Sequence, residues 1–442
     1  MARLQPDALN PGVRKREVFG WAMYDFANSG YTTVVLTAVF AAYFIGGVAG
    51  SAPWATFAWT ATLAASSALV MLTMPALGAW ADLRAAKKRA LAVSTVGCVL
   101  CTAGLALVGP GDVWLAVVFV LLSNLFFSWG DALIAAFLPE LARPASLGKV
   151  SGWGWSFGYL GGMLTLGLSL AWVLSAQARG EPASQFVPVT MVITAAVYAL
   201  AATTTFVLLR ERAVPQPQRA DQGGAGAALA RLARTWRQAR QFRDFNALLA
   251  CGLAYQAGIA VVIALAAVYA EQAMGFKQTE TMLLIFLVNI AAAGGAFAWG
   301  HVQDRIGHRA ALAATLVGWI GMVVLAVAAT GPGLFWVAAV LAGLCMGSSQ
   351  SAGRALAGAF APVAQRAEFF GLWAFATRLA AIVGPLTYGA VTWATAGNHR
   401  LAIGCTGVFF VIGLWLLMRV DVARGETAAQ AADRQDAAVK PL

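Results

Sequence analysis

Long apolar blocks alternate with short polar ones along the chain. A helix needs about 20 mostly apolar residues to cross a hydrocarbon core of ~30 Å, and twelve blocks meet that length. We predict helices at 18–45, 54–80, 90–109, 113–138, 150–175, 186–209, 246–271, 279–301, 311–330, 334–358, 368–395 and 400–419. Membrane helices tolerate the Gly and Pro inside these blocks, because neighbouring helices satisfy the freed backbone groups. The pattern therefore predicts an all-α membrane protein with twelve transmembrane helices.

Composition and charge support a membrane location. Of the 442 residues, 60% are hydrophobic and 11% are charged, which excludes an ordinary soluble domain. The net charge of +11 fits either nucleic-acid binding or membrane topology, and the loops decide between them. Basic residues crowd the segment 14–16 and the loops after the second and sixth blocks, whereas the opposite loops carry only Arg179, Lys277 and Arg400. The positive-inside rule then predicts cytoplasmic termini in a plasma (inner) membrane, and no nucleic-acid partner.

The N-terminus and the cysteines add little special chemistry. Residues 1–16 lack the apolar region of a signal peptide, so we expect the first helix to act as the insertion signal. All five cysteines lie inside predicted helices, so disulfides are not expected. Cys98 and Cys101 form a CxxC without a second pair or a nearby His, which favours packing over metal binding. We assign no metal and no cofactor.

An internal repeat divides the chain into two halves. The segment GAWADLRAAKKR (78–89) is echoed by GHVQDRIGHR (300–309), 222 residues later, and two further echoes recur at 223. A parallel repeat of six helices follows. We predict a cytoplasmic N-terminus (1–17), two six-helix bundles (18–210 and 246–420), a linker (211–245) and a cytoplasmic tail (421–442). Within the linker, residues 228–243 have the spacing of a basic amphipathic helix, which either lies on anionic lipid or is solvated.

The repeated segment resembles the signature loop of the major facilitator superfamily. The second copy supplies Asp304, Arg305 and Arg309, and the degenerate first copy keeps Asp82 and Arg84. The resemblance implies two pseudo-symmetric six-helix bundles, with each loop aspartate facing a helix N-terminus, where the helix dipole favours a carboxylate. The alternative is a loop that serves membrane topology alone.

Three longer segments resemble the vacuole-effluxer family. They are FGWAMYDFANSGYTTVV (19–35), AFLPELARPASLGKVSGWGWSFGYLGG (136–162) and EFFGLWAFATRLAAIVGPL (368–386). The best-known members export amino acids from the fungal vacuole. The resemblance therefore implies a transporter of small solutes, and it marks Gln350, Arg354 and Arg378 as residues of interest.

Four ionisable residues lie well inside predicted helices: Asp25, Asp131, Arg354 and Arg378. Each costs roughly 2.5 to 3.5 kcal/mol at a helix centre on an insertion scale, so each should face a partner or a wet cavity. Their positions make them candidates for the substrate and proton site.

Three neutral polar residues lie near these charges. Asn28 and Tyr31 follow Asp25 at spacings of three, and Gln350 precedes Arg354 by one turn. Either substrate contact or helix–helix hydrogen bonding explains them.

These features predict a secondary transporter, which we expect to be a monomer. The sequence has no P-loop and no catalytic constellation, which argues against an ATPase or another enzyme. Solute gradients, facilitated diffusion or proton coupling remain as driving forces. The two acids and two arginines suit a zwitterion such as an amino acid. A drug or metabolite efflux pump and a transporter-derived sensor without transport are the alternatives.

Two predictions concern individual charges. Asp25 has the less obvious arginine partner, so it is the first candidate for a proton carrier, since a desolvated carboxylate without such a partner protonates more readily. Subtracting the repeat offset of 223 from 354 gives 131, which places Asp131 and Arg354 at equal depth in helices 4 and 10. We predict that these two residues pair across the halves as a gate.

Overall fold

The computed structural model describes residues 8–50, 52, 54–213, 242–276, 278–395 and 398–438. Within these ranges twelve helical segments are long and apolar enough to cross a membrane. The predicted all-α fold with twelve membrane helices is therefore confirmed.

The N-terminal half contains six of these segments. Its first membrane helix is continuous from Lys15 to Val48 and includes two π-helical stretches, which widen the helix locally. The elements are α1 (Lys15–Tyr31), η2 (Thr32–Ala38), α2 (Phe40–Tyr43), η3 (Phe44–Val48), α3 (Ala55–Leu83), α4 (Lys87–Gly104), η4 (Leu105–Leu107), α5 (Val113–Ala135), α6 (Leu138–Leu141), η5 (Pro144–Ser146), α7 (Leu147–Ala178) and α8 (Ala183–Leu208).

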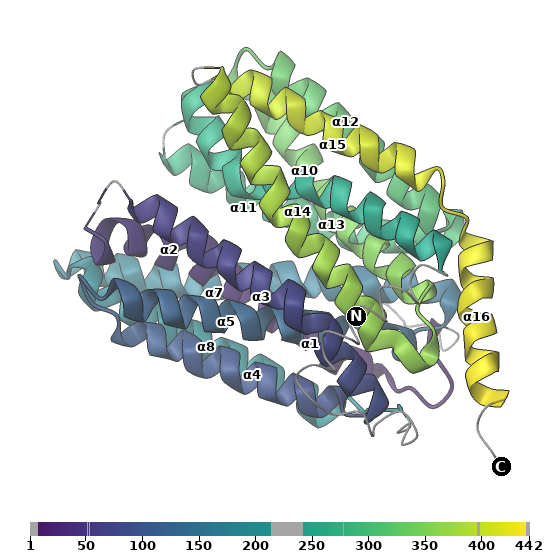
Figure 1. Cartoon of the computed structure of the whole chain (residues 1–442). Helices are drawn as coiled ribbons and strands as arrows, with labels where there is room; N and C mark the ends of the chain where they lie inside the picture. Colours follow the sequence, from purple (N-terminus) through teal and green to yellow (C-terminus); the bar gives the residue numbers. More distant parts are fainter. Residues whose placement is uncertain are drawn as a thin grey trace.

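The C-terminal half repeats this arrangement. Its elements are α10 (Arg243–Met274), α11 (Gln278–Ile306), α12 (His308–Ala328), α13 (Pro332–Ala359), η7 (Val363–Gln365), α14 (Arg366–Ala394), α15 (His399–Leu417) and α16 (Val422–Ala438). Figure 1 shows the two halves as two layers of long helices, purple to blue and teal to yellow.

One end of the molecule carries the start of α1, the end of α8, the start of α10 and α16, and we call it the linker side (Figure 1). The segment predicted as a tail contains a helix, α16, across this end. Arg424 of α16 forms an ion pair with Asp244 of α10 at 2.7 Å. Asp433 accepts a hydrogen bond from the Val363 backbone nitrogen at 2.7 Å. The predicted amphipathic helix at 228–243 falls almost entirely outside the described residues.

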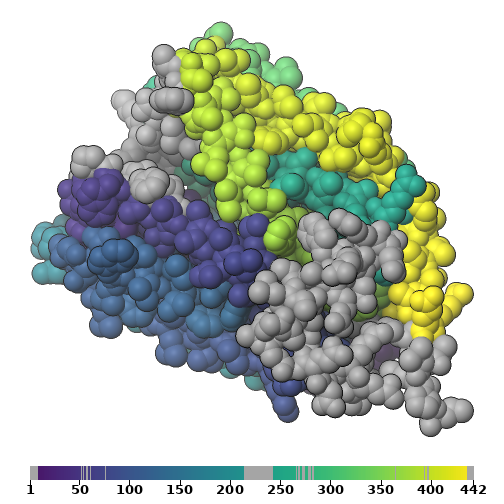
Figure 2. Space-filling model, viewed as in Figure 1, coloured from purple at the N-terminus to yellow at the C-terminus, as the bar shows by residue number. Residues whose placement is uncertain are grey.

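The two halves pack closely on the linker side. Helix α3 packs against α14, and α7 packs against α11 and α13; the contact between α3 and α14 is visible in Figure 2. Glycines permit this approach: a Cβ at Gly78 would lie 2.5 Å from the Ala367 carbonyl oxygen, and one at Gly152 would lie 2.4 Å from that of Ala296. Gly152 is in the second turn of α7, so the halves are closed against each other on the linker side.

Candidate functional site

A buried ion pair joins the two halves. Arg354 of α13 donates from Nη1 to Asp25 Oδ2 of α1 at 2.7 Å, and the two side chains are 7% and 8% exposed. The other guanidinium nitrogens donate to Ser151 of α7, Nε to Oγ at 3.1 Å and Nη2 to the carbonyl oxygen at 2.8 Å. The Arg354 charge is therefore matched by one carboxylate and two further oxygens.

Aromatic rings and a glycine enclose the pair. The Arg354 guanidinium carbon lies 4.7 Å from the ring centroid of Trp21 and 5.3 Å from that of Trp155, within range of cation–π attraction. A Cβ at position 154 would lie 2.3 Å from Asp25 Oδ2. A side chain at that position would displace the paired carboxylate, so the glycine allows α7 to approach the ion pair.

The structure contradicts two expectations about the partners of these charges: that Asp131 pairs with Arg354, and that Asp25 has no obvious arginine partner. Arg354 pairs with Asp25, not with Asp131, so the predicted gate pair is absent from the described residues. Asp25 thus has a direct arginine partner, which removes the reason for choosing it as the proton carrier. Equal depth in the repeat does not fix which neighbouring helix a side chain faces.

Asp131 of α5 has a neutral partner instead. Asn28 of α1 donates from Nδ2 to Asp131 Oδ1 at 3.3 Å, and the Asn28 oxygen accepts from the Tyr198 hydroxyl at 2.8 Å. Asp131 is partly exposed, although Asn28 and Tyr198 are buried. The hydrogen bond from Asn28 therefore orients the Asp131 carboxylate, and the residue as a whole is less buried than Asp25.

Arg378 of α14 faces the N-terminal half. Its guanidinium carbon lies 5.7 Å from the ring centroid of Phe127, a residue of α5 like Asp131, and the side chain is half-buried. The negative charge of Asp131 acts favourably on Arg378. Within the described part of the chain, however, neither residue belongs to an ion pair.

The remaining polar candidates make helix–helix hydrogen bonds. The Tyr31 hydroxyl lies 2.8 Å from Ser123 Oγ, and its ring stacks on Phe127 at a centroid distance of 5.0 Å. The Gln350 amide exchanges two hydrogen bonds with Gln256 of α10, at 2.6 and 3.2 Å. These contacts agree with the structural interpretation left open above, and they do not test a role in substrate binding.

Both signature-loop aspartates reach a helix N-terminus in the opposite half. Asp82 Oδ2, at the end of α3, accepts from the Glu368 backbone nitrogen at 3.0 Å, in the first turn of α14. Asp304 Oδ1 and Oδ2, at the end of α11, accept from the Lys149 backbone nitrogen at 3.2 and 3.1 Å, in the first turn of α7. This reciprocal geometry is what the family resemblance implied. It brings a carboxylate to the positive end of a helix twice, across the same interface.

The signature-loop arginines lie elsewhere. Arg84 is exposed, with its guanidinium carbon 5.5 Å from the ring centroid of Trp80. Arg305 is exposed as well, and Arg309 donates to the Met418 carbonyl oxygen of its own half at 2.8 Å. Of the loop residues singled out from the sequence, the aspartates make the contacts between halves.

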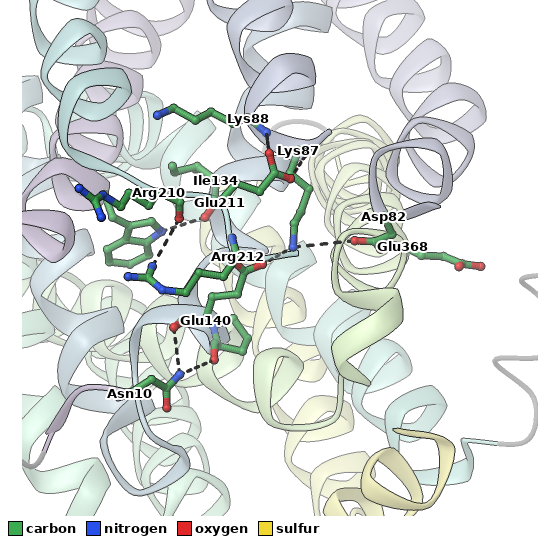
Figure 3. Close-up of polar contacts among 12 residues, drawn as sticks. Asn10, Asp82, Lys87, Lys88, Ile134, Glu140, Arg210, Glu211, Arg212 and Glu368 are labelled. Atoms are coloured by element: carbon green, nitrogen blue, oxygen red, sulfur yellow. Dashed lines mark hydrogen bonds and ion pairs between the residues drawn. The ribbon is translucent and has the colours of Figure 1, made fainter. Parts of the chain in front are cut away.

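The sequence did not reveal a buried charge network beside Asp82 (Figure 3). Lys87, which is 1% exposed, forms a short ion pair with Glu140, and its Nζ lies 3.9 Å from Asp82 Oδ1. Glu140 Oε2 also accepts from the Arg212 backbone nitrogen at 3.4 Å, and Arg212 forms an ion pair with Glu17 at 2.8 Å. The charges of Lys87 and Glu140 were visible in the sequence, but their burial was not, since they lie just outside the predicted apolar blocks.

Glu211 attaches the start of the linker to the same network. Its carboxylate oxygens accept from the backbone nitrogens of Lys87 and Lys88 at 2.7 and 3.1 Å, at the N-terminus of α4. Burial raises the pKa of the Glu211 carboxyl, and these two donors act in the opposite direction. The segment after α8 is thereby fixed to the start of α4, which follows the short loop after Asp82.

Comparisons with known proteins give the family. Residues 50–430 match the family model described as "Vacuole effluxer Atg22 like". The chain is 27% identical to the "Uncharacterized MFS-type transporter YxiO" of Bacillus subtilis over 406 residues, 90% of this chain and 93% of that one. It is 30% identical over 189 residues to "Autophagy-related protein 22-1" of Penicillium rubens, a match that covers 39% of this chain and 32% of the fungal protein.

The fold comparison agrees with the family assignment. The structure of the human organic anion transporter MFSD10 (TETRAN) has a TM-score of 0.71, with 17% sequence identity, covering 91% of this chain and 99% of that one. This likeness shows the fold, which is that of the major facilitator superfamily. The chain therefore belongs to the vacuole effluxer Atg22-like family, and it is an integral membrane transporter of the major facilitator type.

Proposed function

We propose that this protein is a secondary transporter that moves a small zwitterion, an amino acid or a similar metabolite, by alternating access. The observation that carries the proposal is the placement of Asp131 and Arg378. They belong to opposite halves, have opposite charges and are partly exposed. No ion pair of either is found among the described residues.

A zwitterionic solute would complement these two charges. An unpaired charge within a membrane helix is costly, and a wet cavity or a partner offsets that cost. The ammonium group of an amino acid would pair with Asp131, and its carboxylate would pair with Arg378. Since one group comes from each half, bound solute would be released when the halves change their relative orientation.

We further propose that the linker side is cytoplasmic and that the protein lies in the plasma (inner) membrane as a monomer. The distribution of Lys and Arg among the loops supports this orientation. The closed linker side described above would then correspond to a state open to the outside. Opening toward the cytoplasm would separate Asp25 from Arg354, and each loop aspartate from its helix N-terminus.

Proton coupling, if it drives transport, is better assigned to Asp131 than to Asp25. Asp25 already has Arg354 as a partner at 2.7 Å, whereas Asp131 accepts from a neutral amide at 3.3 Å. A carboxylate that exchanges a proton must be reachable, and Asp131 is the more exposed of the two. We therefore propose Asp131 as the residue that binds both the proton and the ammonium group.

Transport into proteoliposomes tests the proposed function. A thermal-shift screen of the purified protein against amino acids and other metabolites comes first, because a ligand of the folded state raises its apparent stability. Radiolabelled uptake of the stabilising solutes should follow, with and without a pH gradient. Asp131→Asn should abolish acceleration by the gradient, and Arg378→Gln should weaken binding of the solute carboxylate by roughly tenfold or more.

The same measurements identify the alternatives. Stabilisation by drugs but by no amino acid would favour an efflux pump. Binding without flux in any gradient would favour a sensor. Unchanged binding in Arg378→Gln would contradict the proposed solute orientation.

A further inference from the structure

A row of hydrogen-bonding side chains leads from Asp131 into the N-terminal half. Asn28 of α1 contacts Asp131 at 3.3 Å, and the Tyr198 hydroxyl of α8 contacts the Asn28 oxygen at 2.8 Å. The Tyr198 and Tyr24 hydroxyl oxygens are 3.4 Å apart, and Tyr24 is 2.8 Å from Thr95 Oγ1 of α4. The four residues beyond Asp131 are only 0% to 6% exposed.

Ionised Asp131 fixes the direction of the first hydrogen bonds. A carboxylate only accepts, so Asn28 must present its amide nitrogen to Asp131 and its oxygen to Tyr198. The Tyr198 hydroxyl then donates its single hydrogen bond to the Asn28 oxygen. Tyr24 donates to Thr95, whose own proton reaches the Leu91 carbonyl oxygen at 2.7 Å. In this arrangement Tyr198 has no proton left for Tyr24.

Protonated Asp131 can use the opposite direction. When its hydroxyl donates to Asn28, the amide turns its oxygen toward Asp131 and its nitrogen toward Tyr198. Tyr198 can accept from that nitrogen because its own proton can rotate toward Tyr24, 3.4 Å away. The remaining hydrogen bonds, from Tyr24 to Thr95 and onward, stay as they were. The change needs an amide rotation and a hydroxyl rotation only.

We propose that Tyr198 is a positioning residue that lets Asn28 form a hydrogen bond with Asp131 in both of its protonation states. When Asp131 is protonated, Tyr24 accepts the hydrogen bond that the Tyr198 hydroxyl donates. A hydroxyl can both donate and accept, which a phenyl ring cannot. The importance of this device for transport rests on the proposed proton coupling. Its effect on the titration midpoint of Asp131 does not depend on proton coupling.

Other charged and titratable groups also face Asp131. They are Asp25 and Tyr24 of α1, Tyr198 of α8, Arg354 of α13 and Arg378 of α14. Asp25 and the two arginines are unchanged in every variant whose titration midpoint is compared below. Differences between the variants therefore report the amide and the hydroxyls.

Infrared difference spectroscopy can follow the protonation of Asp131 without a known solute. The carbonyl stretching band of a carboxylic acid appears as Asp131 is protonated, and Asp131→Asn should remove it while Asp25→Asn should not. Tyr198→Phe should move the titration midpoint to lower pH by about half a unit, because the rotated amide of protonated Asp131 would bury an unpartnered N–H, which proteins tolerate less well than an unpartnered oxygen. Asn28→Leu should move it to higher pH by about one unit, because the carboxylate loses its donor.

Two more variants make the test independent of any single side chain. Tyr24→Phe should also lower the midpoint, by less than Tyr198→Phe, because only the protonated state needs the Tyr24 oxygen. It supplies the result if Tyr198→Phe fails to fold. Tyr255→Phe is the matched control and should leave the midpoint unchanged. Tyr255 is equally buried on α10 and packs over Gly353 as Tyr24 packs over Gly130.

The outcomes separate this inference from the proposed function. Midpoints that move in opposite directions for Asn28→Leu and Tyr198→Phe support the positioning role, even if no zwitterion is transported. Midpoints that move in the same direction, or that do not move, overturn it, even if transport is found. An infrared band that survives Asp131→Asn would overturn it as well.

Discussion

The Asp25→Asn substitution should shift the protein away from the conformation described here. Arg354 would keep its contacts with Ser151 but lose the Asp25 carboxylate. Breaking a buried ion pair by removing one partner costs about 3–5 kcal/mol. In this variant Arg354 still donates to the two Ser151 oxygens and to the amide oxygen of the asparagine. We therefore expect a cost near the lower end of this range. Because the pair joins α1 to α13, we expect most of that cost to fall on the closed linker side.

A cost of about 3 kcal/mol changes the ratio of closed to open molecules by roughly a hundredfold. Electron–electron distance measurements can detect this change with spin labels on Arg89→Cys and Ala310→Cys, after replacement of the five native cysteines. Both positions are exposed and lie at the linker-side starts of α4 and α12, in opposite halves. The population with the longer label distance should increase in Asp25→Asn.

Glu17→Gln provides the matched control. Glu17 is buried and forms an ion pair of nearly the same length, 2.8 Å, with Arg212, but this pair joins the start of α1 to the segment after α8 and does not connect the two halves. This variant should lower the melting temperature without changing the label distance. If Asp25→Asn behaves in the same way, the Asp25–Arg354 pair contributes to folding and does not hold the halves together.

Three other predictions use the same preparations. Gly152→Ala should favour the open linker side by about 1–3 kcal/mol, because its Cβ would overlap the Ala296 carbonyl oxygen, and the label distance should lengthen. Asp304→Asn should act in the same direction by about 0.3–2 kcal/mol through the lost charge–dipole attraction, and an unchanged distance would contradict that role. Arg424→Ala should change the melting temperature less than Asp244→Ala, since Arg424 is half exposed while Asp244 is buried; an equal loss would contradict this ranking.

The sequence predicted the fold well because lipid restricts the alternatives. A chain within lipid must satisfy its backbone groups locally, so hydropathy alone located the twelve membrane helices found among the described residues. The repeat at an offset of about 223 residues also agrees with the structure in detail. Gly130 and Gly353 differ by that offset, and each lies beneath a buried tyrosine of the first helix in its half.

The sequence predicted the residues of the candidate site better than their partners. The four intramembrane charges all face the interior of the bundle, as the cost of exposing them to lipid requires. Their pairing depends on small rotations of neighbouring helices, which no spacing within one helix encodes. For that reason the repeat predicts an ion pair between Arg354 and Asp131, whereas Arg354 pairs with Asp25. Ser151 could not be identified either, since its contribution to binding Arg354 includes its backbone oxygen.

The two loop aspartates have an evolutionary consequence. Each binds a backbone N–H in the opposite half, at Glu368 or at Lys149, and backbone groups are present whatever side chain stands there. Substitutions at 149 and 368 can therefore accumulate without loss of the contact, provided that the helix still begins in the same place. Pairwise covariation, which depends on compensating side-chain changes, should give no signal for either contact. In distant relatives, the aspartate and the helix start should persist together while the residue that donates the hydrogen bond varies freely.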